Sequence, residues 1–280
     1  MAGRVGTRNT GKMKVAKSDH TSRSAFTLIE MLVTIAVIAL LLAILLPALT
    51  AAKQKTKQLV CRSNLRQLVI ANNCYSDDNN GNYVRAAPAI FEVNKHRWYG
   101  VRENTNDPFN RAKGPLASYL QGQNLNCTVK VNYRKVPPSQ DDYDEGSGGY
   151  GYNIFYIGSV IWSNEYEDEY LNTAAKNTNV RQPSQTLMFA DTAMAESDCY
   201  TEYSFAIPRY FVVDGVSVID TGWDPDPSIH FRHRNRANIG WVDGSVTSKK
   251  MGKYEETNQA DIKMKLGWFE PINNTMFDLK

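Results

Sequence analysis

The chain has 280 residues, enough for one large domain or two small ones. Its formal net charge of +3 is unevenly distributed, because residues 1 to 25 carry +5 and residues 26 to 280 therefore carry −2. This mildly acidic remainder argues against nucleic acid as a partner, since a nucleic-acid-binding domain usually displays a basic stripe.

An apolar run follows the basic N-terminal segment. Residues 31 to 52 hold no charged side chain, and Glu30 precedes them directly. As a helix, these 22 residues would span about 33 Å, which matches the roughly 30 Å hydrocarbon core of a bilayer. A cleaved secretory signal has a shorter apolar region of about 7–15 residues, and a buried core helix is rarely apolar on every face. The run therefore predicts a membrane-spanning helix.

The helical pattern continues beyond the apolar run. Apolar residues recur near helical spacing, with charged residues between them, at Leu59, Leu65, Leu68, Val69 and Tyr75. The pattern ends in a turn-like polar stretch at residues 76 to 81. We expect one helix from about Thr27 to about Tyr75, bent near Pro47.

The remainder of the chain reads as short strands and long loops. Residues 186–190, 211–213, 216–219 and 152–157 are strand-like, and residues 238–247 predict a hairpin with an Asp243-Gly244 turn. The fold class expected is α+β, with a long N-terminal helix packed on a head that contains an antiparallel β-sheet and long loops.

Residues 25 to 33, Ala-Phe-Thr-Leu-Ile-Glu-Met-Leu-Val, resemble the processing site of type IV pilins and type II secretion pseudopilins. The resemblance implies that a prepilin peptidase cuts between Ala25 and Phe26 and methylates the new amine of Phe26. The family usually has Gly before the cut, where this chain has Ala25. Pro47 resembles a proline that bends the helix in the family.

The resemblance also implies a division of the chain and a location. Residues 1–25 would be a cleaved leader, 26–52 a transmembrane helix, 53–80 its extension and 81–280 the extracytoplasmic head. Similar numbers of basic residues flank the apolar run, so the positive-inside rule leaves its orientation open. The resemblance places the leader in the cytoplasm, a single span in the inner membrane, and the head in the periplasm or at the cell surface.

Glu30 has two interpretations. In assembled filaments of the family, the corresponding carboxylate is thought to face the amine of a neighbouring subunit's first residue, here Phe26. Such a pair would reduce the cost of two lone charges in hydrocarbon. The alternative is a capping box, because Thr27 and Glu30 have the spacing that satisfies the first amides of a helix. We favour the filament role, and the two are compatible at different stages.

A second resemblance lies near the C-terminus. His233, nine further residues and then Asp243-Gly244 resemble the H-X9-DG segment, residues 233–244, that ends many prepilin-type proteins. The resemblance supplies no role for it. Three other stretches, residues 61–67, 149–153 and 183–191, also resemble parts of that group.

No residue pattern predicts a metal, a cofactor or catalysis. His230 and His233, with Asp243 or Asp226 nearby in sequence, are the residue types that suit zinc, but they form no complete ligand set. We expect a hydrogen-bonding pair near the Asp-Gly hairpin instead. We predict no bound metal, no cofactor and no catalytic residue, so the chain is not expected to be an enzyme.

The four cysteines are Cys61, Cys74, Cys127 and Cys199. An extracytoplasmic head would permit disulfides between them. Cys61 and Cys74 lie 13 residues apart on one expected helix, roughly 20 Å, so they cannot bond to each other. Of the three complete pairings, the two that join each of these cysteines to Cys127 or Cys199 remain. Free buried thiols are the alternative.

Two functions follow from these patterns. The first is a pseudopilin-like or minor-pilin-like structural subunit of a type II secretion or type IV pilus-like system. Its partners would be the prepilin peptidase, other pilin or pseudopilin subunits and the membrane. The alternative is a surface-anchored module that uses a pilin-type export signal and binds a carbohydrate or other ligand through its aromatic head, which contains Trp98, Trp162, Trp223 and Trp241.

Overall fold

The computed structural model describes residues 26–90, 92–123, 125–129, 131–133, 145–159, 173–196, 199–213, 216–218, 226–253, 262–271 and 274–279. Its internal contacts divide the chain into two compact units, with the boundary between Leu49 and Thr50. The division into leader, span, extension and head stays a prediction.

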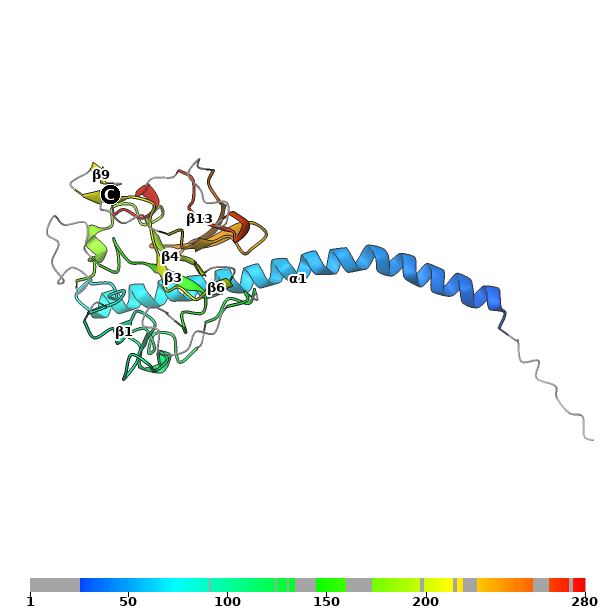
Figure 1. The fold of residues 1–280 in the computed structure, drawn as a ribbon, viewed down its shortest axis with the longest axis horizontal. Helices are drawn as coiled ribbons and strands as arrows, with labels where there is room; N and C mark the ends of the chain where they lie inside the picture. Colours follow the sequence, from blue (N-terminus) through cyan, green and yellow to red (C-terminus); the bar gives the residue numbers. More distant parts are fainter. Residues whose placement is uncertain are drawn as a thin grey trace, which may run out of the picture. The chain divides into compact units, whose positions relative to one another are not determined.

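A single long helix begins the described chain. Helix α1 spans Leu28–Asp78 (Figure 1). It contains Pro47. It ends where Asn80 and Gly81 adopt positive φ angles of 55° and 80°, and the N–H of Gly81 donates back to the carbonyl of Ser76 at 2.9 Å. Glycine tolerates this left-handed backbone without strain. The long helix expected from the sequence is confirmed.

The main sheet of the second unit has five strands. They are β3 (Tyr150–Asn153), β4 (Leu187–Asp191), β7 (Phe205–Ala206), β11 (Arg236–Trp241) and β12 (Val246–Lys250). The strand order is β12-β11-β4-β3-β7. All neighbouring strands are antiparallel except β3 and β7, which are parallel. The α+β class, with a sheet rich in antiparallel pairs, is confirmed.

Shorter elements surround this sheet. Four two-stranded ribbons pair β1 (His96–Arg97) with β2 (Gly100–Val101), β5 (Met194–Glu196) with β6 (Cys199–Thr201), β8 (Phe211–Val213) with β9 (Val216–Val218), and β10 (Ile229–His230) with β13 (Leu266–Gly267). The 3-10 helices within the described residues are η1 (Arg111–Lys113), η3 (Asn177–Asn179) and η4 (Asn274–Met276).

Most strand predictions hold, and one is displaced. Strands β4, β8 and β9 and the hairpin of β11 and β12 lie where they were expected, with Gly244 in the turn at φ 87°. The segment expected over 152–157 is wrong in its bounds, because β3 begins at Tyr150 and turns follow Asn153. The strand starts earlier because Tyr150 and Gly151 already pair with Asp191 and Ala190 of β4. A side chain at Gly151 would clash with the side chain of Thr192.

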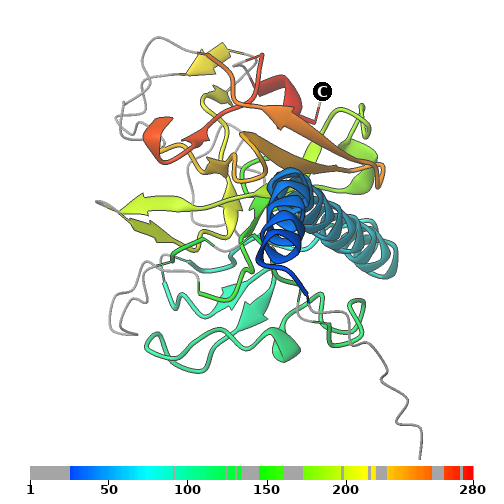
Figure 2. The same ribbon diagram turned by 90° about the vertical axis from the view of Figure 1, so that its right-hand side faces the viewer.

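The second half of α1 packs against the sheet. Its buried residues recur at helical spacing: Cys61, Asn64, Leu65, Leu68, Val69, Ala71, Asn72 and Ser76. The helix lies close to β11, where a Cβ on Gly240 would meet Cγ2 of Val69 at 2.8 Å. Figure 2 shows this part of the helix between β11 and β12 on one side and the segment of β1 and β2 on the other.

Buried amides on α1 hold the helix to the sheet by hydrogen bonds. Nδ2 of Asn64 donates to the hydroxyl of Tyr150 at 3.1 Å, and Nδ2 of Asn72 donates to the hydroxyl of Tyr152 at 2.9 Å. The Tyr152 hydroxyl donates in turn to the carbonyl of Val84 at 3.0 Å. These bonds satisfy polar groups that would be costly to bury alone, and they fix the helix along strand β3.

Candidate functional site

The start of α1 is the first candidate site. Thr27 and Glu30 form a capping box: the backbone N–H and the hydroxyl of Thr27 both donate to Oε2 of Glu30 at 2.8 Å, and the N–H of Glu30 donates to Oγ1 of Thr27 at 3.2 Å. Phe26, just before the helix, is 64% exposed. Ala25, on the other side of the expected cut, lies outside the described residues.

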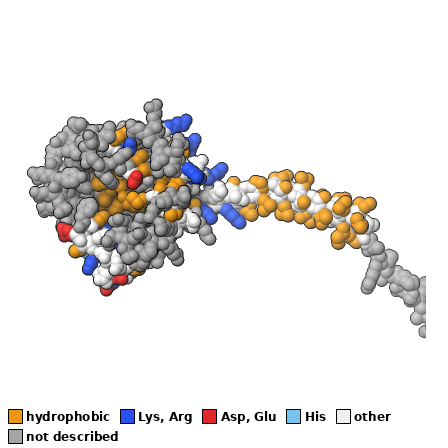
Figure 3. All heavy atoms as spheres, in the orientation of Figure 1, with side chains coloured by type: hydrophobic (Ala, Val, Ile, Leu, Met, Phe, Trp, Pro, Cys, Tyr) orange, Lys and Arg blue, Asp and Glu red, His pale blue; other side chains and the backbone are white. Residues whose placement is uncertain are grey.

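The first half of α1 exposes apolar side chains on every face. Every residue from Phe26 to Leu49 is exposed, and Figure 3 shows hydrophobic side chains along this part of the helix. Three exposed lysines follow, Lys53, Lys55 and Lys57. Among the described residues, α1 is the one helix long and apolar enough to cross a membrane, judged by length and composition. Pro47 lies in its apolar part and donates no backbone hydrogen bond.

The H-X9-DG segment is divided by a strand. His233 precedes β11 and Asp243-Gly244 follows it, so the two ends lie about 20 Å apart along six residues of strand. Oδ1 of Asp243 accepts from the N–H of Ser245 at 2.8 Å, which is local turn chemistry. The hydrogen-bonding pair expected near the Asp-Gly hairpin is therefore wrong in its place, because β11 keeps His233 away from that turn.

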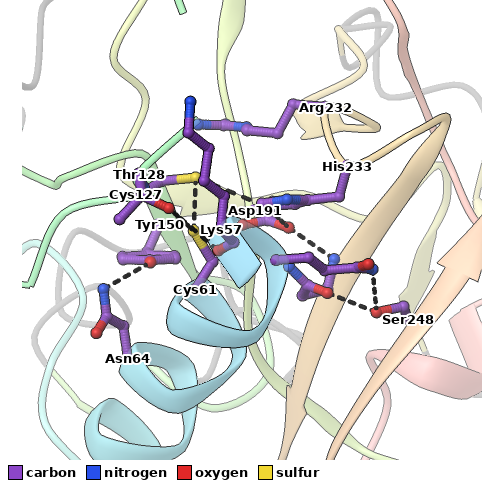
Figure 4. Close-up of polar contacts among 12 residues, drawn as sticks. Lys57, Cys61, Asn64, Cys127, Thr128, Tyr150, Asp191, Arg232, His233 and Ser248 are labelled. Carbon is purple, nitrogen blue, oxygen red and sulfur yellow. Dashed lines mark hydrogen bonds and ion pairs between the residues drawn. The ribbon is translucent and has the colours of Figure 1, made fainter. Parts of the chain in front are cut away.

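A buried cluster surrounds His233 instead. Nε2 of His233 lies 3.3 Å from Oδ2 of Asp191 at the end of β4, and both side chains are excluded from solvent. The same nitrogen lies 3.6 Å from Sγ of Cys127, and Sγ of Cys127 lies 3.0 Å from Sγ of Cys61 on α1 (Figure 4). The ligand atoms of these two cysteines and His233 lie within 4.8 Å of one another.

A buried arginine borders the cluster. Arg232 donates from Nη1 to the hydroxyl of Tyr133 at 2.7 Å and from Nη2 to the carbonyl of Thr192. Gly149 leaves room for it, since a Cβ at that position would meet Nη1 of Arg232 at 2.5 Å. Arg232 thus places a positive charge inside the protein, beside the sulfur atoms (Figure 4).

The cluster alters the ionisation of its members. The pKa of Cys61 falls to about 3, chiefly because Cys127 hydrogen-bonds to its sulfur and also because His233 and Thr128 do. The pKa of Cys127 rises, because it hydrogen-bonds to Cys61 and is buried. Burial alone would lower the pKa of His233, but hydrogen bonds to Asp191 and Cys61 raise it to about 9. The arrangement therefore favours a negative charge on the sulfur pair beside a protonated imidazole.

The other candidates from the sequence, His230, Asp226 and Asp243, do not join this cluster. His230 stacks on Tyr200 with ring centroids 4.7 Å apart, and burial lowers its pKa to about 2. Asp226 is exposed. Within the described residues, the group that could hold a metal contains neither histidine–aspartate combination considered from the sequence.

Two tryptophans considered for ligand binding belong to the core. Nε1 of Trp98 donates to the carbonyl of Ser204 at 2.8 Å, and Nε1 of Trp241 donates to Oγ1 of Thr247 at 2.8 Å. Both side chains are buried. Trp162 and Trp223 lie outside the described residues.

Sequence reasoning missed two members of the cluster. Asp191 ends a stretch that resembles other prepilin-type proteins, but nothing in the sequence connects it to His233. Arg232 reads as a surface charge, and its buried position follows only from the tertiary fold. The two remaining cysteines lie elsewhere, with Cys74 exposed on α1 and Cys199 partly buried on β6.

Comparison with known proteins bears on the N-terminal segment. The family profile of the prokaryotic N-terminal methylation motif matches residues 20–46, which include the expected cut and the capping box. No curated protein and no solved structure matches the chain. The match supports a type IV pilin-like protein with a pilin-type export signal and a membrane anchor near its N-terminus.

Proposed function

We propose that the chain is a pseudopilin-like or minor-pilin-like structural subunit of a type II secretion or type IV pilus-like system. A prepilin peptidase would cut between Ala25 and Phe26 and methylate the Phe26 amine. The observation that carries the proposal is the coincidence of the methylation motif, residues 20–46, with the start of a helix that exposes apolar side chains on every face.

The exposed apolar surface supports assembly as well as anchoring. Apolar side chains all around a helix are stable only in lipid or against other apolar helices. Before assembly, this helix of a subunit would span the bilayer. In a filament, the same helix would pack against the helices of neighbouring subunits. The head would remain on the extracytoplasmic side, and the chain would act as a substrate of the peptidase rather than as an enzyme.

The anchored carbohydrate-binding module receives no support from the described residues. Trp98 and Trp241 are buried and hydrogen-bonded, so neither offers an open aromatic face on which a sugar could stack. The structural subunit is therefore the function that the geometry favours.

The test is the mature N-terminus. The chain is produced with a prepilin peptidase, and the membrane fraction is analysed by intact-mass and N-terminal peptide mass spectrometry. We expect a chain of 255 residues, from Phe26 to Lys280, with a methylated amine. Ala25→Gly should be cut at least as well, since the family usually has Gly there, and Ala25→Arg should block the cut. An intact Met1 terminus in the unaltered chain, with active peptidase present, contradicts the proposal.

A further inference from the structure

We propose that Cys61 and Cys127 form a disulfide bond that ties helix α1 to the segment preceding β3. The two sulfur atoms already lie 3.0 Å apart, although 66 residues separate them in the sequence. A disulfide has an S–S distance of about 2.05 Å, so the sulfurs need to approach by only about 1 Å. This inference does not depend on assembly of the chain with other subunits.

The backbone on both sides of Cys127 is fixed to the helix. The carbonyl of Asn126 accepts from Nδ2 of Asn64 at 2.9 Å. The hydroxyl of Thr128 donates to the carbonyl of Lys57 at 3.1 Å. Residues 126 to 128 are therefore held against the turns of α1 on either side of Cys61, and the two sulfurs face each other as a consequence (Figure 4).

Several groups favour a thiolate at this position. The backbone N–H of Thr128 donates to Sγ of Cys61 at 3.2 Å. His233 contacts Cys127 at 3.6 Å, and the buried Arg232 adds a second positive charge beside the sulfurs. Hydrogen bonds with the side chains of Cys127, His233 and Thr128 lower the pKa of Cys61. The thiolate is the nucleophile in thiol–disulfide exchange, so the site is prepared for oxidation by a disulfide donor.

The burial of the two cysteines sets the order of the steps. Cys61 is buried, whereas Cys127 is partly exposed. Cys127 would pass its proton to the Cys61 thiolate, 3.0 Å away, and attack one sulfur of the donor disulfide, and one donor thiolate would leave. Cys61 would give that proton to the departed donor thiolate and attack Cys127, breaking its bond to the donor and releasing the second donor thiolate. The two cysteines are oxidised and the donor is reduced to two thiols, which take up the proton of Cys127 and one proton from the solvent.

A metal ion is the competing occupant, and three observations disfavour it. A tetrahedral zinc ion would hold two thiolate sulfurs roughly 3.7 Å apart, further than the 3.0 Å between Cys61 and Cys127. Nε2 of His233 faces Asp191, and their pairing needs a proton on Nε2, where a metal would bind instead. A metal-bound His233 would carry its proton on Nδ1, and among the described residues Nδ1 has no hydrogen-bond partner that could orient the ring. Arg232 also places a fixed positive charge beside the site.

Differential alkylation of the full chain tests the proposal. The chain is purified in detergent under reducing conditions and moved to a buffer of oxidised and reduced glutathione, which supplies the donor. Samples are denatured in the presence of N-ethylmaleimide, reduced, labelled with iodoacetamide and digested with trypsin. An unreduced portion of each sample is digested directly. Zinc bound to the chain is measured on the same preparation before the redox buffer is added.

The expected product is a linked pair of tryptic peptides, residues 58–62 and 114–130, two hydrogen masses below their sum. Cys74→Ser and Cys199→Ser should leave this pair intact, whereas Cys61→Ser should leave Cys127 as a thiol. Three results would overturn the proposal. The first is that N-ethylmaleimide labels both Cys61 and Cys127 after incubation in the oxidising buffer. The second is a disulfide from Cys61 or Cys127 to Cys74 or Cys199. The third is one equivalent of bound zinc that protects Cys61 and Cys127 from alkylation until a chelator is added.

Discussion

Nε2 of His233 lies 3.3 Å from Oδ2 of Asp191, and this pair joins the start of the H-X9-DG segment to the end of strand β4. The same carboxylate oxygen accepts from the backbone N–H of Asn238 in β11 at 2.7 Å. Asp191 therefore contacts both the side chain of His233, which precedes β11, and the backbone of β11 itself. The histidine side chain therefore lies at the sheet and the sulfur cluster, away from the Asp243-Gly244 turn.

The first prediction is a loss of stability at alkaline pH. The folded state raises the pKa of His233 to about 9, compared with about 6.5 in an unfolded chain. The favourable pairing is therefore fully present below pH 6.5 and is lost as the pH rises through 9. The loss should reach up to about 3 kcal/mol of the free energy of unfolding. Urea unfolding of the reduced chain measures it, and in the Cys61→Ser/Cys127→Ser background the loss should be smaller, because Cys61 supplies part of the rise in the pKa of His233.

Two histidine variants separate this effect from a general pH response. His233→Gln keeps a polar side chain but cannot become positively charged, so it should flatten the curve between pH 6.5 and 9. His230 has its pKa lowered to about 2, so its contribution is present above pH 6.5 and is lost as the pH falls. His230→Gln should therefore change the acid side of the curve alone. An unchanged alkaline slope in His233→Gln contradicts the pairing.

The second prediction concerns the stability that the disulfide would add. Closing a loop of 66 residues should stabilise the folded state by about 4 kcal/mol through the entropy of the unfolded chain. Oxidised chain should thus require more urea to unfold than reduced chain, and Cys61→Ser should remove the difference. Cys74→Ser is the matched control, because it lies on the same helix and is exposed. Equal midpoints for the oxidised and reduced chain would count against a structural bond.

The third prediction tests the contact of α1 with β11. Gly240→Ala would place a Cβ 2.8 Å from Cγ2 of Val69, a buried atom on the helix. We expect a destabilisation of about 1–3 kcal/mol from overpacking. Val69→Ala removes the opposing methyl groups, so the double variant should be more stable than the sum of the two single effects predicts. If the free-energy changes of the two single variants simply add in the double variant, the helix moves aside to accommodate the new methyl group, and the contact is not tight.

Local patterns were sufficient to predict the helix and most of the sheet. The apolar stripe placed Leu65, Leu68 and Val69 on the buried face of α1, although its first member, Leu59, is exposed. The Asp243-Gly244 turn predicted the hairpin of β11 and β12. Strand β3 was misplaced because Gly151 resembles a turn residue in sequence. In the structure it is a strand residue whose missing side chain makes room for Thr192.

The sulfur cluster could not be predicted in this way. Cys61, Cys127 and His233 come from a helix, a loop and the approach to a strand, and 66 and 106 residues separate neighbouring members of the group. Helix and strand periodicities relate only residues that are close in the sequence, so they do not connect positions so far apart. The helical rise excluded a bond between Cys61 and Cys74, but only the packing of α1 on the sheet selects Cys127 as the neighbour of Cys61.

The last prediction concerns Glu30, which caps its own helix in the isolated chain. Thr27 and Glu30 satisfy each other through three hydrogen bonds. A carboxylate used in this way could still meet the Phe26 amine of a neighbouring subunit during assembly. The two roles need different properties of the side chain: the cap needs a hydrogen-bond acceptor, whereas the pair between subunits needs a negative charge.

Two matched variants separate these properties. Glu30→Gln keeps the acceptor and removes the charge, and Thr27→Val keeps the charge and removes the hydroxyl of the cap. If Glu30 pairs with a neighbour's amine in hydrocarbon, Glu30→Gln should leave that amine uncompensated, at about 3–5 kcal/mol per contact. Thr27→Val should then cost only the cap, about 0.5–2 kcal/mol. A purely local cap predicts the reverse order, because Gln serves in a capping box nearly as well as Glu.

Assembly is measured by incorporation of each variant into filaments or cross-linked oligomers beside the unaltered chain. Cleavage after Ala25 and methylation of Phe26 are checked in every sample, because an uncut chain has no free amine at Phe26 to pair. Normal cleavage with failed assembly of Glu30→Gln, and normal assembly of Thr27→Val, is the result we expect. If Glu30→Gln assembles normally, the carboxylate is a helix cap alone, and contacts between subunits must come from the apolar surface of α1.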